Sequence, residues 1–425
     1  MERTILHVDM NNFYATVECL HHPEWRDKPI AVSGSAEKRH GVVLAKSEAA
    51  KKCGVKTGDT LWQAQRKCPD ILFVEPHFEL YQKYSYLAKE IYLNYTDRVE
   101  SFGLDECWLD VTGASHFGGD GKLIADEIRR RIKEELGVTA SVGVSFNKIF
   151  AKLGSDMKKP DATTLITREN YKKLVWPLPV GDLLFVGKAT KERLSECGIK
   201  TIGELALSDP DELLRMLGKN GLSLRSYARG EDKSEVEAYS TAREIKSIGN
   251  STTTPRDLIE EDEIKITLYA LCESVAERMR EKALVCRTVQ INLRDNALLT
   301  TDRQGKLDYP SCVSSVLFEK AYSLYKESGW TKRPLRTIGV RACDLEEEEN
   351  LQISFLPEFE KMQKKEEEER TIDNIRRRFG HFSVQRGIML SDPDLSGINP
   401  KERHTIHPEI FNRKKRGSKG FDIEE

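Results

Sequence analysis

The first 166 residues alternate between short apolar runs and longer segments with helical spacing, and this alternation limits the folds that the chain can adopt. The short runs are rich in β-branched and aromatic residues, which favour strands. The longer segments repeat apolar residues every three to four positions, which favours amphipathic helices. We therefore expect strands at residues 5–8, 30–33, 42–45, 71–74, 99–102, 107–111 and 138–144, and helices at 13–20, 78–94, 122–136 and 148–156. The mixed order of these elements predicts an α+β sheet with its helices on one face.

Three further stretches follow, each with its own pattern. Residues 167–240 lack convincing strands and favour helices joined by a glycine-containing hairpin. Residues 241–345 return to strands, at 289–293 and 337–340, around a long helix at 262–282. Residues 346–425 form a tail, in which positions 346–370 hold ten acidic and four basic side chains. We expect that run to be solvated and able to form a helix, and the basic end around 413–416 to be disordered.

Charge and cysteine content exclude several classes of protein. A net charge of -2 argues against a uniformly basic nucleic-acid binder, although it leaves room for local basic surfaces. No apolar run approaches the roughly 20 residues of a membrane-spanning helix, and charges interrupt the first apolar stretch, which argues against a signal peptide. The nine cysteines include no C-x-x-C pair, which disfavours a disulfide framework or a Cys-based zinc site and favours a reducing cytoplasm.

Three carboxylates stand next to expected strands. Asp9 follows the first strand, and Asp105 and Glu106 lie between two strand-like runs, after Gly103. Neighbouring residues of a regular strand point to opposite faces, so both carboxylates can face one site only at a hairpin tip or a bulge. Three carboxylates at one sheet edge offer the hard oxygen ligands that Mg²⁺ prefers. The alternative is that Asp105 and Glu106 are ordinary turn residues and Asp9 is a helix cap.

A basic segment follows the strand expected at 138–144. Lys148 and Lys152 lie one turn apart on one helical face, and Lys158 and Lys159 follow where Pro160 ends the helix. A lysine at this place can hold a phosphate as a point charge. The alternative is a solvated basic face.

Five segments, in this order and at this spacing, resemble the Y-family DNA polymerases, closest in type to bacterial DNA polymerase IV. They are residues 7–18, 103–110 and 143–160, the helix-hairpin-helix segment around Val186, Gly187 and Lys188, and residues 246–249. The resemblance covers about residues 1–344. It implies an α+β multidomain fold with a ferredoxin-like palm (1–166) that carries small inserted fingers (about 20–76), a helix-hairpin-helix thumb (167–240), an α+β little finger (241–345) and an acidic and basic tail (346–425).

The resemblance also implies roles for single residues. Asp9, Asp105 and Glu106 match the family's catalytic, metal-binding carboxylates, and the Met10 carbonyl matches its backbone ligand. Tyr14 matches the aromatic steric gate that excludes a 2′-hydroxyl. Lys159 matches the lysine that contacts the incoming triphosphate, and we expect Lys51 to meet a phosphate of the nucleotide as well. We expect contacts to the DNA phosphates from Val186, Gly187, Lys188, Lys148, Lys152, Lys246 and Arg336, with Arg287, Arg294, Arg333 and Arg341 as additional basic residues of the third stretch.

The fingers depart from the family pattern. The usual Tyr-Glu-Ala-Arg reads Glu48-Ala49-Ala50-Lys51 in this chain. Lys51 can still meet a phosphate, but the tyrosine hydroxyl is missing, which bears on how the nucleotide is positioned. The segment is also similar to the polymerase V catalytic subunit, so the sequence leaves both subfamilies open.

The implied reaction is template-directed addition of deoxynucleotides to a primer 3′ end with two Mg²⁺ ions. The implied partners are primer-template DNA and deoxynucleoside triphosphates, and the implied role is low-fidelity lesion bypass in DNA damage tolerance by a monomer. We expect no proofreading exonuclease, because no separate segment is large enough for one. The pentapeptide Gln352-Ile353-Ser354-Phe355-Leu356 resembles the peptide that binds the sliding clamp, and the alternative is a short strand packed on the body.

Two other functions compete with this interpretation. A palm-type nucleotidyl cyclase is one, because Gly118-Gly119-Asp120 is similar to the diguanylate cyclase signature; here we interpret it as a capping turn. A catalytically silent DNA-binding scaffold is the other, and the intact carboxylates and Lys159 argue against it. We interpret His404 and His407, spaced i and i+3, as surface residues because they lack partners for a metal site.

Overall fold

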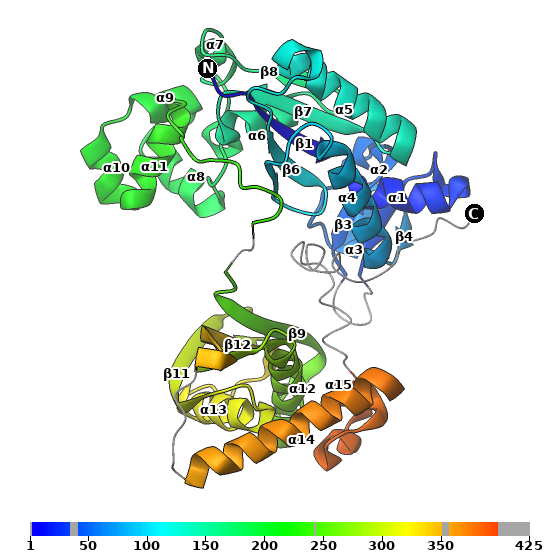
Figure 1. Cartoon of the computed structure of the whole chain (residues 1–425), viewed down its shortest axis with the longest axis vertical. Helices are drawn as coiled ribbons and strands as arrows, with labels where there is room; N and C mark the ends of the chain where they lie inside the picture. The colour runs from blue at the N-terminus through cyan, green and yellow to red at the C-terminus, as the bar shows by residue number, and fades with distance from the viewer. Residues whose placement is uncertain (1, 35–40, 242–243, 351–356, 398–425) are drawn as a thin grey trace. The chain divides into compact units, whose positions relative to one another are not determined.

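The computed structural model describes residues 2–34, 41–241, 244–350 and 357–397. They form two compact units, one made of residues 2–33 and 43–241 and the other of residues 244–397. Figure 1 draws both units, each with its own sheet and helices. In the parts that the structure describes, no helix is long and apolar enough to cross a membrane.

The first unit is built on a five-stranded mixed sheet in the order β5-β6-β1-β7-β8. Its strands are β1 (Ile5–Met10), β5 (Val99–Ser101), β6 (Glu106–Asp110), β7 (Ala140–Ser145) and β8 (Thr163–Leu165). The central strands β1 and β7 are buried along their whole length, because helices cover both faces. Four of these strands lie within a few residues of their predicted places, whereas β8 was not predicted.

The helices do not share one face of this sheet, so that part of the prediction is wrong. Side chains of α4 (Phe78–Tyr92) and α5 (Gly121–Leu136) pack in the core that contains Leu6 and Val8 of β1. Ile5 packs instead with Ala151 of α6 (Lys148–Met157). Successive strand residues point to opposite faces, so α6 covers the face of β1 that carries Ile5, His7 and Asp9.

The close approach of α6 to the sheet depends on Gly143 in β7. A Cβ atom there would lie 1.9 Å from the Ala151 carbonyl oxygen and 2.5 Å from the Ser155 amide nitrogen. At its start α6 is capped by Asn147, whose Oδ1 accepts a hydrogen bond from the Phe150 N–H at 2.8 Å. Helix α6 therefore lies directly on the backbone of the sheet, and Gly143 permits the short distance between α6 and β7.

Two smaller layers complete the first unit. A three-stranded sheet, β3-β2-β4, carries two short helices and its own small core. Its elements are β2 (Ile30–Ser33), β3 (Val43–Lys46), β4 (Leu72–Val74), α2 (Glu48–Lys52) and α3 (Leu61–Lys67), next to α1 (Phe13–His21) and the short turn η1 (Pro23–Trp25). Residues 167–241 are helical, with no strand in this described stretch: α7 (Tyr171–Leu174), η3 (Val180–Asp182), α8 (Lys188–Glu196), α9 (Ile202–Leu207), α10 (Pro210–Leu217) and α11 (Lys219–Ala228).

The Gly118-Gly119-Asp120 motif lies at a helix start, as interpreted from the sequence. It spans the end of η2 (His116–Gly119) and the N-cap of α5. The Asp120 Oδ1 accepts hydrogen bonds from the Lys122 and Leu123 N–H groups at 2.8 and 3.1 Å. The aspartate therefore caps a helix and does not occupy a hairpin, which argues against the cyclase.

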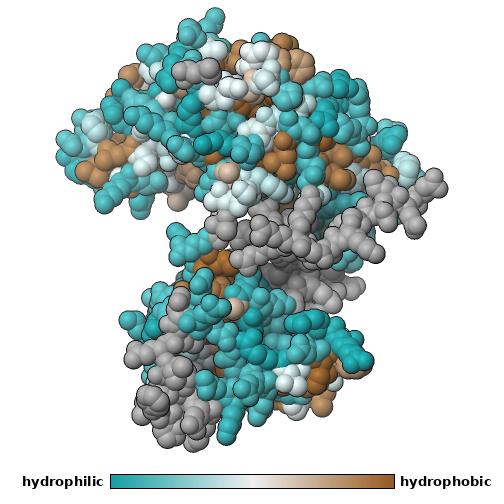
Figure 2. Space-filling model, in the orientation of Figure 1, coloured by the Kyte–Doolittle hydropathy of each residue, from teal (hydrophilic) through white to brown (hydrophobic). Residues whose placement is uncertain are grey.

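The second unit contains a four-stranded antiparallel sheet in the order β11-β10-β12-β9. Its strands are β9 (Ser247–Leu258), β10 (Leu284–Asp295), β11 (Thr300–Ser311) and β12 (Leu335–Glu347). Helices α12 (Glu261–Arg280) and α13 (Ser314–Glu327) share the apolar core with one face of this sheet. Figure 2 shows a largely hydrophilic surface on both units.

The acidic run at 346–370 differs from the solvated tail that we expected. Strand β12 continues to Glu347, and after η4 (Glu348–Asn350) the chain resumes as α14 (Pro357–Phe379). The rest of the described chain forms η5 (His381–Ser383), η6 (Gly387–Ser391) and α15 (Pro393–Ser396). Glu369, Asp373 and Arg376 of α14 are buried, so one side of the helix belongs to the second unit.

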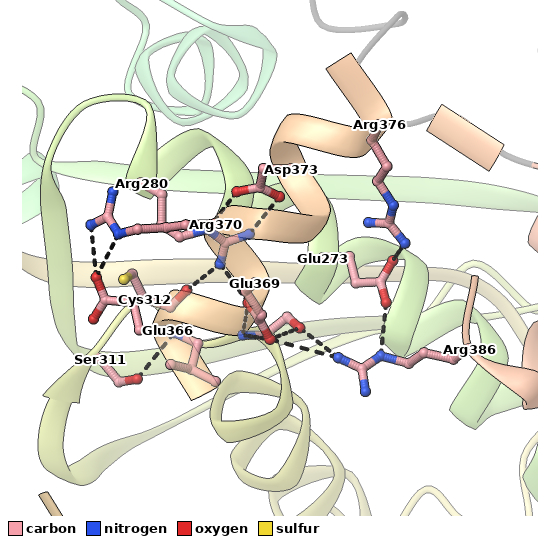
Figure 3. Close-up of polar contacts among 12 residues, drawn as sticks. Glu273, Arg280, Ser311, Cys312, Glu366, Glu369, Arg370, Asp373, Arg376 and Arg386 are labelled. Carbon is pink, nitrogen blue, oxygen red and sulfur yellow. Dashed lines mark hydrogen bonds and ion pairs between the residues drawn. The ribbon is translucent and has the colours of Figure 1, made fainter. Parts of the chain in front are cut away.

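A network of ion pairs attaches α14 to the rest of this unit (Figure 3). Asp373 accepts two hydrogen bonds from the Arg280 guanidinium, at 2.7 and 2.9 Å. Glu369 also pairs with Arg280, and it accepts the Ser314 N–H at 2.9 Å at the first turn of α13. Glu273 of α12 lies between Arg376 at 2.9 Å and Arg386 at 2.7 Å. Helix α14 thus supplies both the counter-charge of Arg280 and the cap of α13.

Candidate active site

The three predicted carboxylates come from two neighbouring strands of the first unit. Asp9 in β1 lies directly opposite Glu106, the first residue of β6, so their side chains share one face of the sheet. Asp105 ends the turn between β5 and β6, and its carbonyl accepts the Met10 N–H at 3.0 Å. Asp105 precedes β6, so the alternation of side chains along that strand does not direct the Asp105 carboxylate to the face opposite Glu106. The structure therefore brings all three carboxylates to one site.

Two lysines lie among these carboxylates. The Lys152 Nζ is 3.2 Å from Asp9 Oδ2 and 3.0 Å from Glu106 Oε1. The Lys159 Nζ is 2.8 Å from the same oxygen of Asp9. Asp156 pairs with both lysines, at 3.2 and 2.9 Å. The ammonium groups thus offset part of the negative charge that the site concentrates.

The pKa values of the three carboxyl groups show that the lysines do not fully offset the negative charge of the site. Burial and the charges of Asp9 and Glu106 raise the pKa of Asp105 to about 7. Burial also raises the pKa of Asp9, although Lys152 opposes that shift. Burial would raise the pKa of Glu106 too, but His7 and the Lys152 ammonium outweigh it and hold that pKa at about 2. The site therefore still favours additional positive charge near Asp105.

A divalent cation would supply that charge. Carboxylate oxygens are the ligands that Mg²⁺ prefers, and the three side chains come from rigid strand ends. As they stand, no three His, Cys, Asp or Glu side chains of the described chain converge closely enough to hold an ion. A physical reason why these side chains do not converge is that the lysine ammonium groups lie among the carboxylate oxygens. The donor set fits the implied metal, provided that these lysines give way to it.

Tyr14 borders the carboxylates from the first turn of α1. Its ring stacks on Tyr81, with centroids 4.2 Å apart and planes inclined by 11°, and it meets Phe78 edge-on at 6.1 Å. Tyr81 in turn donates a hydrogen bond to the buried Glu18 carboxylate. Burial, and then the charge of Asp105, raise the pKa of Tyr14 to about 12, so the phenol stays neutral. Tyr14 is thus a rigid aromatic wall beside the carboxylates.

The small sheet contributes basic residues, one of which the sequence prediction missed. Lys51 in α2 donates to Glu48 Oε1 at 3.3 Å, and Asn12 donates to the same oxygen at 2.7 Å. Lys46, at the end of β3, was not predicted as a site residue. Burial and then the charges of Lys51 and, more weakly, Lys159 lower the pKa of Lys46. Lys46, Lys51 and Lys159 therefore concentrate positive charge and favour the binding of an anion. The sequence signal that could have identified Lys46 is its place at the end of a strand, next to α2.

Lys148 and Lys152, both expected to contact DNA, have partners within the chain. Lys148 pairs with Glu100 at 2.6 Å, and its Nζ lies 4.6 Å from the centroid of the Trp108 ring. Lys152 pairs with the carboxylates, and only 12% of each lysine side chain is exposed. These positions do not favour a DNA contact by either residue.

Comparison with known proteins decides the family. Residues 8–156 match the model of the impB/mucB/samB family, and residues 245–355 match the C-terminal domain of that family. The chain is 53% identical over 400 residues to the DNA polymerase IV of Acetivibrio thermocellus, with 94% of this chain and 100% of that protein covered. The chain belongs to the Y family of DNA polymerases.

Other members of the family extend the comparison. The DNA polymerase IV of Clostridium acetobutylicum is 36% identical, and the match covers 92% of this chain and 99% of that protein. The DNA polymerase IV 1 of Bacillus subtilis is 35% identical, and the match covers 91% of this chain and 93% of that protein. These names favour the polymerase IV type over polymerase V. A solved Y-family DNA polymerase chimera of Dbh and Dpo4 shares the fold, with a TM-score of 0.72 and 23% identity over 81% of this chain and 99% of that one.

The thumb of this Y-family chain presents an open helix start. Gly187 is the N-cap of α8 and has no side chain to cap it, and a Cβ atom there would meet nothing within 4 Å. Lys188 follows with 91% of its side chain exposed, whereas Val186 is buried. Backbone N–H groups at such a helix start can meet phosphates whatever the base sequence.

The little finger presents one polar sheet face. Val289, Ile291 and Leu293 of β10 lie in the core, so the residues between them point to the other face. Arg341 of β12 is exposed on that face, opposite Gly249 of β9. Of the other predicted basic residues, Lys246 is exposed before β9 and Arg336 is half-buried. The remaining three have partners within the chain: Arg294 donates to the Leu298 carbonyl at 3.4 Å, Arg287 pairs with Glu346, and Arg333 pairs with Asp295 at 3.0 Å.

Several predictions lie outside the described residues. The clamp-like peptide, residues 352–356, is one. His404, His407 and the basic end around 413–416 are the others.

Proposed function

We propose that the chain adds deoxynucleotides to the 3′ end of a DNA primer under the direction of a template strand. The observation that carries this proposal is the meeting of Asp9, Asp105 and Glu106 at the ends of β1 and β6, in a chain of the Y family. Primer-template DNA and deoxynucleoside triphosphates are the substrates that this chemistry requires.

The carboxylates would hold two Mg²⁺ ions, with the Met10 carbonyl as a backbone ligand. When bound, the ions supply the positive charge that favours the primer 3′-alkoxide and stabilises the pyrophosphate leaving group in an in-line displacement. Asp9 and Asp105 would hold the ions, and Glu106 would serve the ion beside the primer hydroxyl. The protein's own contribution is to fix these oxygens on rigid strand ends before the substrates arrive.

Lysines and an aromatic wall would bind the incoming nucleotide. Lys51, Lys159 and Lys46 concentrate positive charge for the triphosphate, each as a point charge. Tyr14, stacked on Tyr81, would lie under the sugar and exclude a 2′-hydroxyl by contact. Lys51 replaces the family's arginine and Glu48 its tyrosine, and Lys46, whose Nζ donates to Thr57 Oγ1 at 3.2 Å, would add a further positive charge beside Lys51.

DNA would be held mainly through its phosphates. The thumb offers the start of α8 at Gly187 and Lys188, and the little finger offers Lys246, Arg336 and Arg341. Such contacts are independent of sequence and weaken as the salt concentration rises.

Low fidelity follows from the small size of the fingers. The helices α2 and α3 comprise five and seven residues, and the core beneath them is small. Such a layer provides little surface to check the shape of the nascent base pair. We therefore propose lesion-tolerant synthesis without proofreading by a monomeric enzyme.

Primer extension tests the proposal. The wild-type chain with Mg²⁺ and four deoxynucleotides is expected to give short, distributive products, and the Asp105→Ala variant none. Asp110→Asn changes a carboxylate at the other end of β6, whose Oδ1 accepts the Thr112 N–H, and serves as the control. No extension by the wild type with intact DNA binding would favour the silent scaffold. No DNA binding at all would favour the cyclase.

We also propose that residues 352–356 bind the replication sliding clamp. The test replaces Phe355 and Leu356 by alanine and measures synthesis with and without a purified bacterial clamp. We expect the stimulation by the clamp to disappear while the basal synthesis remains, and the control Glu367→Gln to behave as wild type. Equal stimulation of the double variant would contradict the proposal.

A further inference from the structure

Lys152 lies among the carboxylates of the site and not on a surface open to nucleic acid. Its ammonium group lies between two carboxylates of different strands, 3.2 Å from Asp9 Oδ2 and 3.0 Å from Glu106 Oε1. A third carboxylate, Asp156 on the next turn of α6, lies 3.2 Å away. The side chain is only 12% exposed, so it is part of the site and not of the surface.

The position of Lys152 is set by the backbone. Gly143 lets α6 lie directly on β7, and Asn147 fixes the first turn of the helix. One turn later, Ser155 donates a hydrogen bond to the Lys152 carbonyl at 2.7 Å and lies 2.9 Å from the His7 Nδ1. Lys152 therefore projects from a helix that is held to β1 and β7 at several points.

The ammonium group has an electrostatic effect that a neutral side chain would lack. Asp9 and Glu106 face each other across β1 and β6, and their charges repel each other when nothing lies between them. A lysine cation at hydrogen-bond distance from both removes much of that repulsion, and its effect is strong because burial lowers the local dielectric constant. The two carboxylates can thus stay close in the metal-free protein.

The same oxygens are the ligands that a divalent cation would need. An ammonium group and a metal ion cannot both contact one carboxylate oxygen from the same side, and their positive charges repel each other. Binding of the ion therefore requires Lys152 to withdraw from Asp9 Oδ2 or Glu106 Oε1. That displacement costs free energy that a substrate-borne phosphate, as an additional ligand, can offset.

We propose that Lys152 is a positioning residue that takes the place of a divalent cation between Asp9 and Glu106, and thereby weakens cation binding until the nucleotide arrives. This inference rests on the metal-dependent function proposed above. It gives Lys152 a role at the carboxylates in place of the expected DNA contact. Lys159 contacts Asp9 but neither Asp105 nor Glu106 in any pairing of the described residues, and it is more exposed, at 29%, so it is better placed to move to the triphosphate.

The test measures Mn²⁺ binding to the full chain without DNA or nucleotide, by electron paramagnetic resonance of the free ion. Lys152→Met keeps the length of the side chain and removes its charge, and we expect at least about tenfold tighter binding of Mn²⁺. Lys152→Arg keeps the charge and is expected to bind as weakly as wild type. Lys158→Met makes the same change of net charge at an exposed position and is expected to leave the affinity unchanged.

A second readout needs no metal. In EDTA, Lys152→Met is expected to melt several degrees below wild type, because Glu106 then loses its lysine partner and Asp9 keeps only Lys159. Mn²⁺ should raise the Tm of this variant more than that of wild type. If the methionine variant does not fold, Lys152→Gln replaces it in both measurements.

The outcomes separate this inference from the proposed function. Mn²⁺ affinity of Lys152→Met within twofold of wild type, or weaker, would overturn the role of Lys152 while leaving the metal site intact. Wild-type binding that Asp105→Ala does not reduce would overturn the metal site itself, and this inference with it.

Discussion

Replacing Asp105 by asparagine is expected to abolish synthesis and, at the same time, to stabilise the metal-free protein. The carboxyl group is buried beside Asp9 and Glu106, and these causes raise its pKa from 3.8 to about 7. Asparagine has nearly the same shape and no charge. The variant therefore keeps the packing of the turn and removes the repulsion.

The sign and size of the effect follow from linkage between protonation and folding. An acid with a raised pKa in the folded state binds its proton more tightly there, so ionisation opposes folding. The penalty is absent below the unfolded pKa of 3.8, grows up to about 7, and is complete above that value. At pH 8 the raised pKa corresponds to about 4 kcal/mol. We expect the Tm of the first unit to rise by roughly 5–10 °C.

The assay is calorimetric unfolding of wild type and Asp105→Asn in EDTA, at pH 8 and again at pH 5. The gain should be largest at pH 8 and smaller at pH 5, and Mg²⁺ should raise the Tm of wild type more than that of the variant. Asp110→Asn, at the far end of β6, serves as the matched control. A Tm of Asp105→Asn at or below wild type at pH 8, or a gain that does not change with pH, would refute this reasoning.

Three further variants test other parts of the structure. Tyr14→Ala should raise the incorporation of ribonucleotides by at least about tenfold, and unchanged sugar selectivity would show that Tyr14 is not the gate. Asp373→Asn leaves a buried arginine without half of its counter-charge and should destabilise the second unit by about 3 kcal/mol in urea unfolding, whereas the exposed Glu367→Gln should not. Gly143→Ala forces α6 off β7 and should lower stability by about 3 kcal/mol or more; an unperturbed Tm would show that the helix can move.

Much of the sheet of the first unit could be predicted from the sequence. Its central strands are buried on both faces, so each is a run of apolar residues that stands out. In the second unit, β10 and β12 were predicted, whereas β9 and β11 were missed. These two are the edge strands of their sheet. Much of β11 is exposed, and the buried positions of β9 include the polar residues Asn250, Thr252 and Thr254, so neither strand gives a strong apolar signal.

Some residues of the site could likewise be predicted from the sequence, and others could not. The carboxylates could be predicted because they stand at the ends of apolar strand-like runs, and Tyr14 because it lies in a segment that resembles the family. The partners of Lys148 and Lys152 could not, because their spacing on a helix does not tell which sheet face the helix covers. The contact of Lys152 with Asp9 depends on Gly143, which brings α6 close to the sheet, and such tertiary proximity leaves no local pattern.

The attachment of α14 changes what a truncation experiment would measure. Removing the chain from residue 346 onward would delete the last residues of β12, strip Arg280 of Asp373 and Glu369, and uncap the first turn of α13. A shortened protein that lost its response to a clamp would then report a damaged second unit as readily as a lost peptide. Point substitutions within residues 352–356 avoid that ambiguity, since they leave every ion pair of α14 in place.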